Sequence, residues 1–324
     1  MCALPGSRFR ERLPEPGKFR DPERTADGSR RARVALERLE TLWFNTGTLC
    51  NIECRNCYME SSPVNDRLAN LSAAEVARYL DEIAELGLPT REIGFTGGEP
   101  FVNPELPAML ADALGRGFEV LVLTNAMRPM MRTATRGALL GLREAHGDKL
   151  HLRVSLDHHG RELHETERGP GTWEPALRGL GWLAANGFRL SVAGRTCWGE
   201  SEAEARRGYR RLFAAQELPL DAADPARLVL FPEMDAALDV PEITGDCWGI
   251  LGVEPAAMMC ASSRMVVKRR AADAPMVVSC TLLPYDEQFE LGGPLADALE
   301  PVRLNHAYCA QFCVLGGASC SAAS

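Results

Sequence analysis

The segment Leu42-Trp-Phe-Asn-Thr-Gly-Thr-Leu-Cys50-Asn-Ile-Glu-Cys54-Arg-Asn-Cys57 joins a short apolar run to three closely spaced cysteines. The apolar run predicts a buried β-strand, and the Thr-Gly-Thr that follows predicts the loop after it. The C-x3-C-x2-C spacing brings three thiolates within reach of one iron–sulfur cluster and leaves the fourth iron without a protein ligand. An open coordination position separates a reactive metal site from a closed structural one. Short cysteine motifs also bind zinc, so this loop alone does not identify the metal.

Strand and helix patterns alternate from Leu42 to Pro232. One helix, over 71–86, opens with Ser72 and Glu75, which predict a capping box. Strands joined by helices pair in parallel and place a site at their carboxyl ends, which fits an α/β partial (β/α)6 TIM-like barrel or an open doubly wound sheet. The predicted strands are Leu42–Asn45, Glu92–Phe95, Glu119–Leu123, His151–Ser155, Arg189–Ala193 and Leu228–Phe231, and further helices begin near Asn103, Thr133, Thr172 and Ser201.

The second predicted strand ends in a further motif, Gly97-Gly98-Glu99-Pro100. Adjacent glycines let the backbone approach a ligand closely, and the carboxylate can accept hydrogen bonds from an ammonium group. An electron carrier or a zinc site has no need of this motif. The two motifs on successive strands therefore favour an enzyme over a non-catalytic iron–sulfur or zinc protein, which is the alternative.

Together the two motifs resemble those of the radical S-adenosylmethionine (radical SAM) superfamily. The resemblance implies that Cys50, Cys54 and Cys57 hold a [4Fe–4S] cluster that binds SAM, and that the GGEP segment binds its methionine amino group. Reductive cleavage of SAM then gives a 5′-deoxyadenosyl radical, which abstracts hydrogen from a peptide or small-molecule substrate. An external reductant such as flavodoxin or ferredoxin is implied as a partner. Asn56 departs from the family, where the residue before the last cysteine is often aromatic.

Weaker matches to the family continue along the barrel, and the resemblance covers roughly residues 42 to 232. Thr124 and Asn125 end the third strand, where the family's Thr-Asn faces the site. Ser155 and Asp157 follow the fourth strand, where family members contact the ribose. Arg195 follows the fifth strand and is expected to reach the methionine carboxylate. No catalytic residue is assigned.

Five further cysteines lie after the barrel, in a region with few clear helices. Thiolate ligation of a metal would explain both facts. The arrangement is similar to the SPASM and Twitch extensions of the superfamily and implies one auxiliary iron–sulfur cluster, although the usual Gly-x4-Cys is absent. A zinc site from the same residues remains open. The expected ligands are Cys260, Cys280, Cys309 and Cys313, with Cys320 as a substitute.

Composition and charge indicate which partners and which cellular location are to be expected. The chain has 324 residues, 11 cysteines and a net charge of −8, without long Lys/Arg runs, so nucleic acid is an unlikely partner. The sequence has no stretch of about 18 apolar residues that could span a membrane, and residues 1–12 lack the apolar segment of a secretion signal, so a cytoplasmic enzyme is expected.

We predict an N-terminal arm over 1–40, with a short helix over 29–40, a barrel over 41–232 and a cysteine-rich domain over 233–324.

Overall fold

Six parallel strands form the centre of the computed structural model, which describes residues 17–235 and 237–318. Their order in the sheet is β2-β3-β4-β5-β6-β7, so neighbours in the sheet are also neighbours in the sequence. A doubly wound sheet would reverse its order at a switch point, so the partial barrel is confirmed and the alternative is excluded. All six predicted strands occur: β2 Thr41–Asn45, β3 Glu92–Thr96, β4 Glu119–Thr124, β5 Leu150–Ser155, β6 Arg189–Thr196 and β7 Leu228–Pro232.

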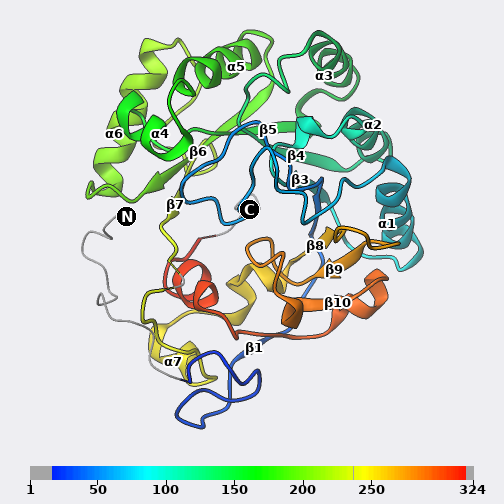
Figure 1. Cartoon of the computed structure of the whole chain (residues 1–324), viewed down its shortest axis with the longest axis vertical. Coiled ribbons are helices and arrows are strands. Elements are labelled where there is room, and N and C mark those ends of the chain that lie inside the picture. The colour runs from blue at the N-terminus through cyan, green and yellow to red at the C-terminus, as the bar shows by residue number, and fades with distance from the viewer. Residues whose placement is uncertain (1–16, 236, 319–324) are drawn as a thin grey trace.

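The connecting helices form an arc outside the strands (Figure 1). The predicted capping box occurs at the start of α1, where Ser72 and Glu75 exchange hydrogen bonds. One helix, α4, was not predicted, and it contributes to the site described below. The helices are α1 Ala73–Glu85, α2 Leu106–Gly115, α3 Thr133–His146, α4 Arg161–Arg168, α5 Trp173–Ala185 and α6 Glu202–Ala215.

Successive side chains of a strand point to opposite faces of the sheet, so the apolar interior consists of two cores. Leu42 and Phe44 of β2 belong to the core between the sheet and the outer helices. Trp43 points to the opposite face and belongs to a second core, which it shares with the C-terminal part of the chain. Its ring lies against Gly94 of β3, where an added Cβ would stand 2.3 Å from the ring. The C-terminal part therefore covers the inner face of the barrel.

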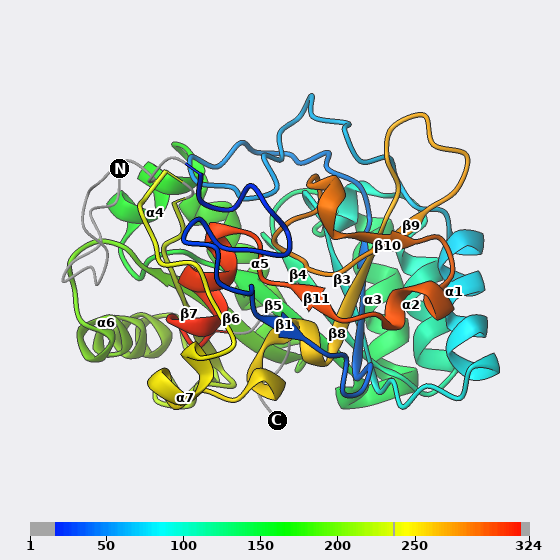
Figure 2. The same cartoon turned by 90° about the horizontal axis from the view of Figure 1, so that it is seen from below.

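Strands from the C-terminal part extend the barrel sheet. Strand β8 (Ser263–Val267) pairs in parallel with β2, and β9 (Met276–Val278) and β10 (Glu290–Gly292) follow in antiparallel order. The two views show this part closing the open side of the barrel (Figures 1 and 2). It also contains α7 (Cys247–Leu251) and a π-helix over Cys309–Val314. The division into barrel and C-terminal domain stays a prediction, because one nine-stranded sheet runs through both.

The N-terminal segment packs on the C-terminal part, and the helix predicted over 29–40 is wrong. Strand β1 (Arg33–Val34) pairs there with β11 (Val302–Arg303) instead. A buried ion pair joins the same two segments, with 2.6 Å between Arg31 Nη2 and Glu242 Oε1. Long-range pairing thus overrides the local helical pattern. None of the helices in the described ranges combines the length and apolar character that crossing a bilayer requires.

Candidate functional site

A cavity of about 120 Å³ opens at the carboxyl ends of the barrel strands. This is the position where barrel enzymes bind their ligands. The three cysteines of the first motif line it together with polar residues from the ends of four strands. Of the predicted site residues, the lining includes Cys50, Cys54, Cys57, Gly97, Gly98, Thr124, Asn125, Ser155, Asp157 and Arg195. It also includes Tyr58, Ser61 and Arg168, for which no role was predicted.

Two of the three thiols, those of Cys50 and Cys54, are buried deeply enough that ionisation is costly without a nearby cation. Burial raises the pKa of Cys50 to about 12 and that of Cys54 to about 11. Such thiols are protonated at neutral pH unless a bound metal stabilises the thiolates. The Ser61 hydroxyl is also buried and, among the described residues, has no hydrogen-bond partner. The donor set and the adjacent cavity fit an iron–sulfur cluster with a second ligand beside it.

The two glycines dock the cysteine loop on the barrel. The amide of Gly98 donates to Gly47 O at 2.8 Å, and that of Glu99 donates to Leu49 O at 3.1 Å. A Cβ at Gly98 would stand 2.3 Å from Leu49 O, which is backbone and cannot turn away. Gly97 has a φ of +143°, a region that favours glycine. The glycines therefore position the loop whether or not they also touch a ligand.

Glu99 faces the end of β4 instead of the cavity. It is buried, and neither it nor Pro100 is part of the cavity lining. Its carboxylate accepts hydrogen bonds from Thr124 Oγ1 and from the Asn125 amide, both at 2.8 Å. Burial outweighs these bonds and raises the pKa of Glu99 to about 7. In this arrangement Glu99 orients Thr124 and Asn125, and its predicted contact with an ammonium group stays a prediction.

Asp157 is held in its charged form by two arginines. Arg168 Nε lies 2.7 Å from Asp157 Oδ2, and Arg195 Nε lies 3.6 Å from Asp157 Oδ1. Burial alone would raise the pKa of Asp157, but these guanidinium groups hold it below its usual value. A carboxylate fixed in this way can accept hydrogen bonds from ligand hydroxyl groups. Arg168 lies on α4, and no sequence pattern predicted an arginine of that helix in the site.

A separate group of His158, His159 and Glu200 lies behind the cavity. Within the part of the chain that the structure describes, only these three ligand-type side chains are grouped with all ligand atoms within 4.8 Å. The Gly160 amide donates to His158 Nδ1 at 2.9 Å, so the neutral ring carries its proton on Nε2, 3.0 Å from Glu200 Oε1. A metal-bound Nε2 would need the proton on Nδ1, opposite that amide. The group is therefore a hydrogen-bonded connection between the loops after β5 and β6.

The four favoured C-terminal cysteines line a second, smaller cavity of about 20 Å³. Cys260 precedes β8, Cys280 follows β9, and Cys309 and Cys313 lie on the π-helix. Burial raises the pKa of Cys260 to about 11 and that of Cys309 to about 12. Cys320 lies outside the described residues. The structure thus brings together four thiols from segments up to fifty residues apart in the sequence.

Fold and site together define a partial-barrel protein with a three-cysteine loop at its strand ends. A sequence model of the radical SAM superfamily matches residues 44–206, half of the chain. The chain therefore belongs to the radical SAM superfamily, whose members are enzymes that use a [4Fe–4S] cluster and SAM.

Relatives and a solved structure show the extent of the similarity. The chain is 32% identical over 145 residues to the antilisterial bacteriocin subtilosin biosynthesis protein AlbA of Bacillus subtilis, covering 44% of this chain and 30% of AlbA. It is 28% identical over 177 residues to the AdoMet-dependent heme synthase of Oleidesulfovibrio alaskensis, covering 54% and 41%. The matched segments are thus less than half of either relative. Streptococcus suis SuiB, solved with its precursor peptide SuiA, shares the fold with a TM-score of 0.51 at 12% identity, over 87% of this chain and 67% of SuiB.

The docking role of Gly98 predicts a large effect of one added methyl group. Gly98→Ala should lower the free energy of unfolding by about 1–3 kcal/mol, because its Cβ would displace the backbone before Cys50. Denaturant unfolding of the metal-free protein measures the change. Gly115→Ala at the end of α2 is the control, since nothing lies within 4 Å of its Cβ. Equal stability of the two variants would contradict the docking role.

Proposed function

We propose that this radical SAM enzyme holds its [4Fe–4S] cluster through Cys50, Cys54 and Cys57 and modifies a peptide substrate. The observation that carries the ligand assignment is the convergence of these thiols and four strand ends on one cavity. When bound, the cluster supplies the electron that cleaves SAM reductively, and the 5′-deoxyadenosyl radical formed abstracts hydrogen from the substrate. A non-catalytic iron–sulfur or zinc protein, the alternative, would not require the polar residues at the ends of the strands.

The polar residues around the cavity suit the parts of SAM. Asp157 stays charged and, with Ser155, can accept and donate hydrogen bonds at the ribose hydroxyl groups. Thr124 and Asn125 line the cavity and are held by Glu99, which accepts hydrogen bonds from the Thr124 hydroxyl and the Asn125 amide. Arg195 carries a positive charge into the lining and can pair with the methionine carboxylate. These assignments leave the hydrogen abstraction itself to the cofactor.

We further propose that Cys260, Cys280, Cys309 and Cys313 hold an auxiliary iron–sulfur cluster. Four thiols around one cavity form a complete ligand set, and their apolar surroundings would destabilise thiolates that lacked a bound cation. The π-helix supports the idea, because such turns occur often at functional sites. A zinc ion held by the same four thiols is the competing occupant.

A peptide is the substrate class that the comparisons favour. AlbA is a bacteriocin biosynthesis protein, and SuiB has been solved with a precursor peptide. A tetrapyrrole is the competing class, because a heme synthase is also similar. We place the enzyme in the cytoplasm, where thiols stay reduced and flavodoxin or ferredoxin can serve as the electron donor.

The first test concerns the cluster ligands. In Cys54→Ala, dithionite-dependent formation of 5′-deoxyadenosine from SAM should fall below detection, because one of three thiolate ligands is lost. Anaerobic reconstitution followed by chromatography of the products measures it. Cys247→Ala on α7 is the control, since Cys247 lines neither cavity. Parental cleavage by the Cys54 variant would refute the ligand assignment.

The second test concerns the auxiliary site. We expect about eight iron atoms per chain in the reconstituted parent, and about four in Cys280→Ala, which should still cleave SAM. Iron and zinc analysis, with the Cys247→Ala variant alongside, measures the change. Four iron atoms and one zinc in the parent would identify the second site as a zinc site. An unchanged iron content in Cys280→Ala would refute its role as a ligand.

The third test concerns the substrate. A short peptide encoded beside this chain in its genome, incubated with reconstituted enzyme, SAM and reductant, should lose hydrogen atoms and change in mass accordingly. Mass spectrometry of the peptide measures this, and the Cys54→Ala variant is the control. Turnover of an iron porphyrin instead, with the peptide unchanged, would replace the peptide by the tetrapyrrole.

A further inference from the structure

Asn56, between two of the cysteines, is held at its amide, its carbonyl oxygen and its side-chain nitrogen. Its amide donates to Glu167 Oε1 at 2.9 Å, and its side-chain Nδ2 donates to Glu167 Oε2 at 3.0 Å. Its carbonyl oxygen accepts a hydrogen bond from Arg195 Nη2 at 2.9 Å. The preceding Arg55 amide donates to the Glu167 carbonyl at 2.8 Å. Both residues between Cys54 and Cys57 are therefore tied to the end of α4.

Glu167, which accepts these hydrogen bonds, is a buried glutamate, and glutamates are rarely buried. Its relative exposure is only 2%, and a buried carboxylate is costly unless it is fully hydrogen-bonded. Both of its oxygens accept a bond from Asn56, and Arg195 Nη1 lies 3.5 Å from Oε1. The cysteine loop thus supplies the donors that make burial of this charge possible. The burial of Glu167 and its hydrogen bonds to Asn56 together indicate that the end of α4 and the cysteine loop fit each other.

We propose that Glu167 is a positioning residue that fixes the turn between Cys54 and Cys57 before the metal binds. The proposal rests on the proposed role of these cysteines as cluster ligands. The two residues between the cysteines set where the two sulfurs stand, so fixing both backbones lowers the ordering cost of cluster binding. The proposal also explains why this position holds Asn56 and not the aromatic residue that is frequent in the family. The side-chain nitrogen of Asn56 donates to the second Glu167 oxygen.

Glu167→Gln tests the positioning role with little change of volume. A glutamine amide keeps one acceptor but turns an NH2 group towards a donor of Asn56, so a charge-assisted bond is lost. Loss of iron to a chelator, followed at the visible absorbance of the cluster, should become about tenfold faster. The electron paramagnetic resonance signal of the reduced cluster should also shift. Glu162→Gln, at an exposed position of the same helix, should match the parent in both.

Asn56→Ala keeps the test valid if the Glu167 variant does not fold. It removes the Nδ2 bond and keeps the backbone bond, so its iron loss should be faster than the parent's but slower than that of Glu167→Gln. The double variant should be no worse than Glu167→Gln alone, because both changes act on one contact. Parental rates and spectra in folded Glu167→Gln, or in Asn56→Ala where the former does not fold, would overturn the proposal. A parent that binds no iron would instead overturn the proposed function.

Discussion

The backbone contact between the cysteine loop and the strand ends is the constraint on which the site depends. The loop has no regular structure of its own, and its polar backbone must be satisfied where it crosses the barrel. The amides of Gly98 and Glu99 donate to it from the segment that follows β3, and the Cys50 amide donates to Ser62 O at 3.0 Å within it. Because Gly98 has no side chain, the two backbones approach closely enough for these bonds to form. The positions of the cysteines follow from this docking.

The charged residues at the cavity form a network that contacts the same cysteine loop. Arg195 lies within 3.6 Å of three buried carboxylates, those of Asp157, Glu167 and Glu233. Charges buried this deeply are stable only as a paired network, and removal of one member leaves its partners uncompensated. The network includes the carbonyl of Asn56, so it connects the loop between the cysteines to the ends of β5 and β6. The three cysteines and the polar lining of the cavity are thus parts of one structure.

The sequence predicted the barrel and the first cysteine site because both depend on local signals. Apolar runs of strand length located all six strands, and the cysteine spacing and the two glycines of the GGEP segment predicted residues that line the cavity. Helix α4 was missed because its sequence, Arg-Glu-Leu-His-Glu-Thr-Glu-Arg, has almost no apolar face. Glu167 was missed for a different reason, since its burial depends on a partner more than one hundred residues away in the sequence. The strand at Arg33–Val34 likewise depends on distant pairing.

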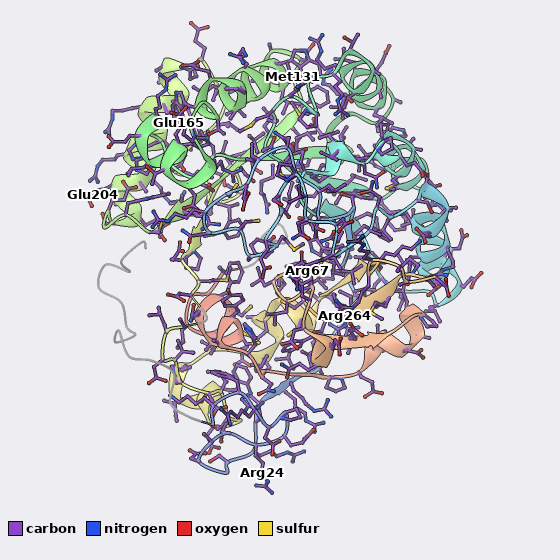
Figure 3. The ribbon with its side chains drawn as sticks, viewed as in Figure 1. Arg24, Arg67, Met131, Glu165, Glu204 and Arg264 are labelled. Carbon is purple, nitrogen blue, oxygen red and sulfur yellow. The ribbon has the colours of Figure 1, made fainter. Side chains whose placement is uncertain are left out.

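The segment that follows the cysteine loop contacts the C-terminal part of the chain. Met59 lines the first cavity, and it belongs to the apolar core that also contains Cys260. Tyr285, a few residues after Cys280, donates its hydroxyl to Met59 O at 2.7 Å. The guanidinium group of Arg67 stacks on the Tyr285 ring, 3.6 Å from its centre, near the middle of the molecule (Figure 3). The segments that follow Cys57 and Cys280 are therefore in direct contact with each other.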